Sequence, residues 1–174
     1  MTEGPLHGKI AYITGGSRGI GRAIALAFAE AGADIAICHL GDAEQAATLV
    51  QAVAARGRRA FQMEADVADP AATRAFADSA EAALGRPCEI LVNNAGINLR
   101  GPFEALTEET FDRVMDVHVK GMVFMARAVY PGMVARGRGR IINIASQLAF
   151  KGGPDIVPYV TAKAAIVGFT RALA

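Results

Sequence analysis

The chain contains no tryptophan, two cysteines, three histidines and no long uninterrupted apolar run. Cys38 and Cys88 stand alone and form no Cys-x-x-Cys pair, which favours buried thiols in a reducing compartment, expected to be the cytoplasm. His7, His39 and His118 show no ligand spacing, so we predict no metal site. No segment approaches the roughly 20 apolar residues of a membrane span. The N-terminal residues lack a basic segment followed by an apolar one, so we expect neither a membrane partner nor a secretory signal.

Neither sign of charge dominates the composition. Lys and Arg total 18 and Asp and Glu total 17, giving a net charge of +1, while hydrophobic residues make up 52%. This balance argues against disorder and against nucleic acid as a partner. The run Arg136-Gly-Arg138-Gly-Arg140 could contact phosphate, but the end of a helix, where cations suit the dipole, explains it better. We predict a single domain over residues 1–174, a length sufficient for a real core.

Strand-like and helix-like segments alternate along the chain. The strand-like runs are 9–14, 34–38, 59–65, 89–92 and 140–146, and the helical runs are 20–31, 42–56, from 69, 107–135 and from 158. Asp42, with Gln45 at the capping-box position, is expected to cap the second helix. This alternation predicts right-handed βαβ units in an α/β fold, with a parallel sheet covered on both faces.

A glycine-rich turn joins the first strand to the first helix, in the sequence Thr14-Gly-Gly-Ser-Arg-Gly-Ile-Gly21. Such a turn lets the backbone approach a pyrophosphate, and the helix N-terminus behind it supplies free N–H groups. The second strand ends in Cys38-His39-Leu40, without the acid that would bind the ribose 2′-hydroxyl of NAD. Arg18 could bind a 2′-phosphate, which favours NADP(H) over NAD(H), although it could also be an ordinary loop residue.

Tyr159 and Lys163 are four residues apart in Tyr-Val-Thr-Ala-Lys, which places both side chains on one face of a helix. A phenol exchanges its proton poorly at neutral pH, since its unperturbed pKa is about 10. A neighbouring ammonium stabilises the phenolate, so the pair is suited to general acid–base catalysis. Ser146 offers a second hydroxyl to the same substrate oxygen. Alone, the spacing is common enough to occur by chance on a surface helix.

Four motifs in a consistent order strengthen that interpretation: Thr-Gly-x-x-x-Gly-x-Gly at 14–21, Asn-Asn-Ala-Gly at 93–96, Ser146, and Tyr159-x-x-x-Lys163. Together they resemble the short-chain dehydrogenase/reductase family, and the resemblance covers the whole chain. It implies a Rossmann-type doubly wound parallel sheet of strand order 3-2-1-4-5, lacking the last two strands of the family fold. It further implies a homotetramer or dimer when the full fold is present.

The resemblance also assigns roles to individual residues. Tyr159 would be the acid/base, Lys163 would assist it and hold the nicotinamide ribose, and Ser146 would hold the substrate oxygen. Asp66 and Val67 would face the adenine, and Ile20 would lie near the nicotinamide. The full cofactor-binding set implied is Gly15, Ser17, Arg18, Gly19, Ile20, Gly21, His39, Asp66, Val67, Asn93, Ala95, Gly96, Tyr159 and Lys163.

Two departures from the family pattern stand out. His118 occupies the place of a family asparagine that holds a water in a proton relay. A relay through His118 would be a fourth catalytic role with a pH dependence near neutrality, whereas the alternative is that His118 satisfies a local backbone group. The chain also ends at Ala174, within the helix that carries Tyr159, which suggests a truncated product with a bare edge on its fifth strand.

The expected activity is the NAD(P)-dependent interconversion of a ketone and a secondary alcohol. Within the family, the sequence from Asn93 onward looks most like 3-oxoacyl-[acyl-carrier-protein] reductases, which implies an acyl thioester substrate. The alternatives are a sugar or polyol dehydrogenase and a catalytically silent nucleotide-binding fragment.

Overall fold

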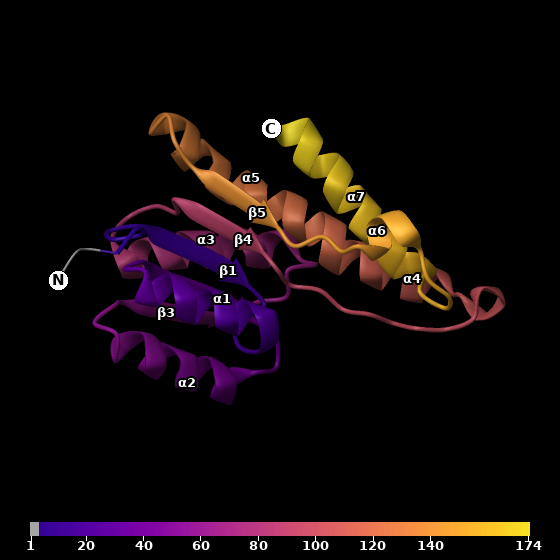
Figure 1. The fold of residues 1–174 in the computed structure, drawn as a ribbon, viewed down its shortest axis with the longest axis horizontal. Helices are drawn as coiled ribbons and strands as arrows, with labels where there is room; N and C mark the ends of the chain where they lie inside the picture. Colours follow the sequence, from indigo (N-terminus) through magenta and orange to yellow (C-terminus); the bar gives the residue numbers. More distant parts are fainter. Residues whose placement is uncertain (1–3) are drawn as a thin grey trace.

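The structure is a computed structural model that describes residues 4–174. The expectation that the N-terminal residues carry no secretory signal rests partly on residues 1–3, which lie outside this range. A parallel sheet runs through the molecule, with helices on both of its faces (Figure 1). Its strands are β1 (Ile10–Thr14), β2 (Asp34–His39), β3 (Ala60–Glu64), β4 (Ile90–Asn93) and β5 (Arg140–Asn143).

The sheet has the order β3-β2-β1-β4-β5, which confirms the predicted Rossmann-type arrangement. Every residue of β1, β2 and β4 is buried, because helices cover both faces of these central strands. The strand order reverses at β1. The strands β2 and β3 lie on one side of β1, and β4 and β5 lie on the other side. In open α/β sheets such a reversal opens a crevice at the carboxyl ends of the strands, and ligands bind there.

Each face of the sheet carries its own apolar layer. On one face Ile13, Ile35 and Ile37 pack with Ala25 of α1 (Gly19–Glu30) and Leu49 of α2 (Ala43–Ala54). The other face is occupied by a cluster built from β1, β2, β4, α3 (Pro70–Leu84), η2 (Asp116–Lys120) and α5 (Gly121–Ala135). Its members include Tyr12, Phe76, Leu91, Met125 and Met133. The two layers fix the sheet, and the loops at its carboxyl edge are therefore held on a rigid base.

The helices agree with the predicted order but differ in detail. They are α1 (Gly19–Glu30), α2 (Ala43–Ala54), α3 (Pro70–Leu84), α4 (Glu108–Met115), α5 (Gly121–Ala135), α6 (Leu148–Lys151) and α7 (Val157–Leu173), with a 3-10 turn η1 (Phe103–Ala105) and a π-helical turn η2 (Asp116–Lys120). The helix predicted over 107–135 is helical over residues 108–135, but the π-turn η2 divides it into α4 and α5. The predicted last strand was too long, since β5 ends at Asn143 and the short helix α6 follows.

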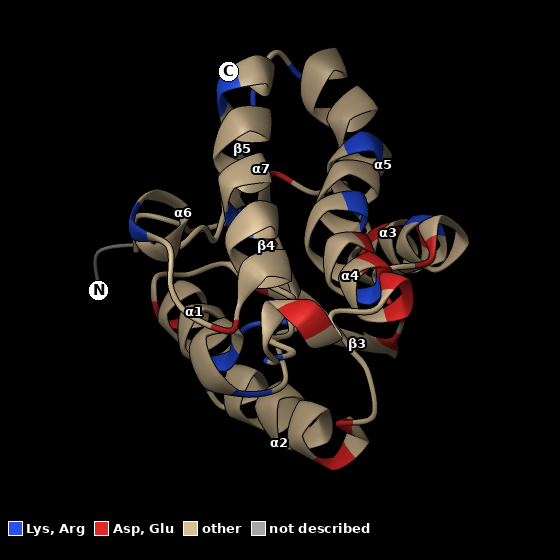
Figure 2. Ribbon diagram, turned by 90° about the vertical axis from the view of Figure 1, so that its right-hand side faces the viewer, with Lys and Arg blue, Asp and Glu red and all other residues tan. Residues whose placement is uncertain are grey.

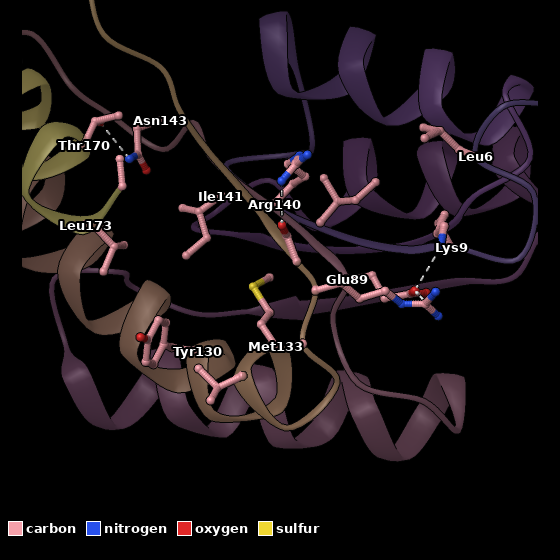
Figure 3. Close-up of a pocket in the computed structure, with 16 residues that line it drawn as sticks. Leu6, Lys9, Glu89, Tyr130, Met133, Arg140, Ile141, Asn143, Thr170 and Leu173 are labelled. Carbon is pink, nitrogen blue, oxygen red and sulfur yellow. Dashed lines mark hydrogen bonds and ion pairs between the residues drawn. The ribbon is translucent and has the colours of Figure 1, made fainter.

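The strand β5 lies at the edge of the sheet, paired with β4. Beside it runs a groove of about 880 Å³, into which Ile141 reaches from β5 while Tyr130, Met133 and Leu173 surround it from α5 and α7 (Figure 3). Ile142, also on β5, is 41% exposed. The expected apolar edge is thus confirmed.

Charged residues of both signs lie on α1, α3 and α4, whereas α5 and α7 carry few charged residues (Figure 2). The first turn of α4 is acidic, with Glu108 and Glu109 at the positive end of the helix dipole. Over residues 4–174, none of the helices has the combination of length and apolar character that a membrane crossing requires.

Candidate active site

A groove of about 490 Å³ lies at the carboxyl ends of the strands, beside the glycine-rich turn. It holds ten of the predicted cofactor-binding residues: Gly15, Ser17, Arg18, Gly19, Ile20, His39, Asp66, Val67, Ala95 and Gly96. Leu40, Asp42, Asn94 and Arg113 also line it, although the sequence analysis did not assign them there. None of Ser146, Tyr159 and Lys163 lines either this groove or the larger one beside β5, and it is the predicted cofactor-binding residues that single out the smaller groove.

The glycine-rich turn is pinned to the end of β4. The Asn94 side chain donates to the carbonyl oxygens of Thr14 and Gly15, each at 3.0 Å. In return, the Thr14 hydroxyl accepts from the backbone N–H groups of Asn94 and Ala95. Gly21 is buried below this contact, and a Cβ there would lie 2.3 Å from Gly15 O. Gly21 is therefore needed for packing beneath the turn, whereas Gly15, with φ +63°, forms the turn itself.

The N-terminus of α1 is open toward the groove. The helix begins at Gly19, and its N-cap residue Arg18 makes no side-chain capping hydrogen bond. The N–H groups of the first turn are therefore available to an anion, and the helix dipole favours one. Ile20, in the same turn, is 64% exposed. The turn, the free N–H groups and the groove together fit the pyrophosphate and sugars of a dinucleotide.

Asp42 corrects one expectation from the sequence. It is the N-cap residue of α2, but its side chain makes no capping hydrogen bond. Its Oδ2 atom instead accepts from Ser17 Oγ and from Arg18 Nε, both at 3.0 Å. These donors hold the pKa of the carboxyl group below its ordinary value, with Arg18 contributing most. Asp42 is thus part of the groove rather than of a helix cap.

The side chains of His39 and Asp66 are engaged at the groove wall. His39 is buried, and its Nε2 atom lies 2.7 Å from Gln62 Oε1. Asp66 accepts from Ala68 N at 2.9 Å and pairs with Arg113 at 2.8 Å. No sequence pattern pointed to Arg113, because only the fold brings α4 beside the loop after β3.

The Tyr159–Lys163 pair lies in the first half of α7. Lys163 is buried, and its Nζ atom donates to Ile144 O at 2.6 Å and lies 5.5 Å from the centre of the Tyr159 ring. Burial lowers the pKa of Lys163 from its ordinary value. Ser146 follows β5, and its Oγ atom accepts from Leu148 N at 3.1 Å, at the start of α6. The helices α6 and α7 pack together, which brings the segments carrying Ser146 and Tyr159 to the same end of the sheet.

His118 sits in the π-turn η2, directly against the tyrosine. The edge of its ring meets the Tyr159 ring with the centroids 5.4 Å apart. Its Nε2 atom lies 2.7 Å from Ile97 O and 3.0 Å from Ile97 N. A Cβ on Gly96 would lie 2.3 Å from the histidine ring, so glycine is needed beneath it. Burial lowers the pKa of His118, the hydrogen bond with the Ile97 backbone opposes this shift, and nearby Lys163 adds to it, so the neutral ring is favoured. A π-turn at this place fits a functional site.

The other predicted cofactor-binding residues, Gly21, Asn93, Tyr159 and Lys163, do not line this groove. Asn93 lines a small enclosed cavity with His118, Val67 and Ala95, and its Nδ2 atom donates to Asn143 Oδ1 at 2.9 Å. Within residues 4–174, His, Cys, Asp and Glu side chains form no group of three or more that could hold a metal ion. Both cysteines are free and buried.

Comparison with known families and proteins agrees with this geometry. The short chain dehydrogenase family profile matches residues 9–174. The (2S)-[(R)-hydroxy(phenyl)methyl]succinyl-CoA dehydrogenase subunit BbsD of Thauera aromatica is 41% identical over 169 residues, covering 97% of this chain and 67% of its own length. The 2-dehydro-3-deoxy-D-gluconate 5-dehydrogenase of Dickeya dadantii is 38% identical, with 97% and 66% covered. The 3-oxoacyl-[acyl-carrier-protein] reductase FabG of Staphylococcus aureus is 36% identical, with 95% and 67% covered.

Two solved structures are similar throughout the chain. A blue fluorescent protein from a metagenomic library, in complex with NADPH, superimposes with a TM-score of 0.89 at 42% identity, covering 97% of this chain and 68% of its own. An NAD⁺-bound xylitol dehydrogenase superimposes with a TM-score of 0.92 at 32% identity, covering 98% and 65%. The chain thus spans about two thirds of the length of the curated relatives that it matches.

Proposed function

The chain belongs to the short-chain dehydrogenase family, and on that premise we propose that it interconverts a ketone and a secondary alcohol with a nicotinamide cofactor. One observation carries the proposal. The buried Lys163 ammonium lies 5.5 Å from the Tyr159 ring, on a helix that packs against the segment after Ser146. A hydroxyl beside a buried cation is suited to giving a proton to a carbonyl oxygen or taking one from an alcohol.

The groove residues would hold the cofactor. The turn at 15–21 and the N-terminus of α1 would bind the pyrophosphate, and Asp66 and Val67 would face the adenine. When bound, the nicotinamide ring supplies or accepts the hydride. We propose NADP(H) as the favoured form because Arg18 offers a guanidinium at the groove, of which 77% of the side chain is exposed. The two similar solved structures hold one form each, NADPH and NAD⁺.

The chain's own side chains then divide the remaining work. Ser146 Oγ and Tyr159 Oη donate to the substrate oxygen, where charge develops during reduction, and lower the barrier electrostatically. Tyr159 transfers its proton to that oxygen in reduction and takes it back in oxidation. Lys163, held by Ile144 O, stabilises the charge left on the phenol. His118 packs against the tyrosine ring and limits its movement.

We propose a 3-oxoacyl thioester as the substrate class. Leu99, Phe103 and Phe150 are 40%, 69% and 73% exposed, and they lie on segments that flank the catalytic residues. A hydrogen bond from Gly101 N to Asp155 O, 3.0 Å long, joins the first of these segments to the approach to α7. Apolar surface there suits an acyl chain. Two of the relatives described above are named for acyl thioester substrates.

A sugar or polyol is the second candidate substrate, since one relative is a gluconate-type dehydrogenase and one similar structure is a xylitol dehydrogenase. Turnover measured in parallel on acetoacetyl thioesters and on polyols separates the two candidates. We further propose that the protein works in the cytoplasm as a homotetramer or dimer. Its buried, unpaired cysteines are compatible with a reducing compartment.

The test of the proposed reaction is the Tyr159→Phe variant. It keeps the ring against His118 but removes the proton donor, so kcat should fall by roughly 10²–10⁴-fold while cofactor affinity stays nearly unchanged. Turnover is followed by the absorbance of NADPH with an acetoacetyl thioester, and affinity by calorimetry. Tyr130→Phe is the matched control, because Tyr130 lies on α5 beside the β5 groove. Full activity in Tyr159→Phe, or binding without turnover in the wild type, would contradict the proposal.

A further inference from the structure

We propose that one buried water molecule is bound between His118, Asn93 and Thr14. These three residues line a small enclosed cavity of about 10 Å³ at the carboxyl ends of β1 and β4. A single buried water needs roughly 10–15 Å³ and two to four polar partners, so the cavity has the size of one water. The site belongs to the fold, and its occupation does not depend on the proposed activity.

Two buried polar atoms at this cavity have no partner in the protein. His118 is 3% exposed and Asn93 is 8% exposed. Within residues 4–174, neither His118 Nδ1 nor Asn93 Oδ1 makes a hydrogen bond. A buried polar group without a partner costs free energy, and buried waters typically bind such groups. A water that reaches both atoms removes this cost at both.

The orientation of the Asn93 amide is fixed by a chain of hydrogen bonds. Thr170 Oγ1 donates to Ile166 O at 2.7 Å, so it accepts from Asn143 Nδ2, which lies 3.0 Å away. Asn143 Oδ1 is then the acceptor for Asn93 Nδ2, at 2.9 Å. The amide oxygen of Asn93 is therefore left for the cavity, as an acceptor that needs a donor.

The contacts of His118 make its Nδ1 atom an acceptor as well. Its Nε2 atom lies 2.7 Å from Ile97 O and 3.0 Å from Ile97 N. The shorter contact joins Nε2 to a carbonyl oxygen, which can only accept, so we assign the ring proton to Nε2. In the neutral ring Nδ1 then carries a lone pair that needs a donor.

Thr14 offers the donor that completes the site. It is 2% exposed, and its hydroxyl oxygen accepts from Asn94 N and Ala95 N, each at 3.0 Å. Both of these bonds use the oxygen, so the O–H proton is available to the cavity. A water that donates to His118 Nδ1 and Asn93 Oδ1 and accepts from Thr14 makes three hydrogen bonds, as buried waters typically do.

A water suits this cavity better than a cation. Ile144 also lines the cavity, and its carbonyl oxygen accepts from the buried Lys163 ammonium at 2.6 Å. The positive charge of Lys163 already acts on His118, and it would repel a second cation. The bound water joins the ends of β1 and β4 to the π-turn η2. It also fixes the tautomer of His118, whose ring edge meets Tyr159.

The test is nuclear magnetic resonance on the wild-type protein labelled with ¹⁵N at histidine. We expect a cross-relaxation signal between a long-lived water and the His118 ring proton on Cε1, which is bonded to Nδ1. The ring ¹⁵N shifts should show the proton on Nε2. Absence of the water signal, or a proton on Nδ1, would overturn the inference and leave the proposed function untouched.

The Val117→Ile variant shows whether the detected water lies in this cavity. It adds one methylene to a buried side chain that lines the cavity, so the water should be displaced, its signal lost and the Nδ1 resonance of His118 shifted downfield. Val114→Ile is the matched control, because it adds the same group to a buried valine of α4 that does not line the cavity. A signal that persists in Val117→Ile, or that is lost equally in Val114→Ile, would overturn the assignment. Should either variant fail to fold, the wild-type measurement decides the inference by itself.

Discussion

At the scale of single residues, His118 has a hydrogen-bonding conflict that the structure makes visible. Its Nε2 atom lies within bonding distance of both Ile97 N and Ile97 O, yet one ring nitrogen can donate or accept but not both. Its Nδ1 atom is buried without a partner among the described residues. The contact with Ile97 agrees with the interpretation that His118 satisfies a backbone group, and a proton relay through it stays a prediction.

The His118→Asn variant tests this conflict. An asparagine amide can donate to Ile97 O and accept from Ile97 N, so it suits both groups. The pKa of His118 is lowered in the folded state, so the unfolded chain takes up a proton first as the pH falls below about 6.5. Stability is therefore full above that pH and is lost below it. Urea unfolding at about pH 7.5 and about pH 5.5 measures the free energy of unfolding at each pH. Its decrease from the higher to the lower pH should be smaller in the variant than in the wild type. Equal decreases in the two proteins would contradict the lowered pKa of His118.

Asp42 and Arg113 show what sequence reading misses at this scale. The spacing of Asp42 and Gln45 fits a capping box. In the structure the Asp42 carboxylate instead accepts from two donors of the glycine-rich turn and makes no capping hydrogen bond. These donors come from 24 and 25 residues away in the chain. A local pattern contains no information on such partners.

At the scale of elements, replacing a glycine by alanine should have opposite effects on the free energy of unfolding in the glycine-rich turn and in α7. Gly21→Ala should lower the free energy of unfolding by about 1–3 kcal/mol, because the new Cβ would meet Gly15 O and Asn94 Nδ2. Gly168→Ala, in α7, should raise it by about 0.5–1 kcal/mol, since nothing lies within 4 Å of the added Cβ. Urea denaturation measures both. A stabilised Gly21→Ala variant would show that the turn is not packed as described.

The π-turn η2 is the element that sequence patterns could not reveal. Residues 107–135 have a continuous helical pattern with a good N-terminal signal, and Thr107 does cap α4 through Thr110 N. One extra residue per turn at Asp116–Lys120 leaves the hydrophobic pattern almost unchanged. It turns His118 inward, toward Ile97 and Tyr159.

At the scale of the whole molecule, Glu89 joins segments that are distant in the chain. It is 5% exposed and pairs with Lys9 before β1, Arg86 after α3 and Arg138 before β5, at 3.2, 3.1 and 3.5 Å. These contacts lie at the amino ends of β1, β4 and β5, opposite the cofactor groove, and the Lys9 pair is drawn in Figure 3. Glu89 therefore supports the sheet rather than the chemistry.

The Glu89→Gln variant should lower the free energy of unfolding by about 1–3 kcal/mol, because three cations lose a buried carboxylate partner. Cofactor affinity should change little, since the site lies at the other end of the strands. Glu81→Gln, on the exposed side of α3, is the control for the loss of one negative charge. Thermal unfolding and calorimetry report the two quantities, and a selective loss of cofactor affinity would contradict this separation.

The sequence by itself determined the alternation of strands and helices, and its ordered motifs, through their resemblance to the family, determined the strand order and the Tyr159–Lys163 pair. These features depend on local periodicity and on short spacings, which a single chain displays directly. Only the tertiary structure decided which side chains meet across elements. It placed Asp42 on Arg18, Arg113 on Asp66 and His118 on Ile97. Such pairings depend on how the sheet and the helices pack, and packing arises from contacts between residues far apart in the chain.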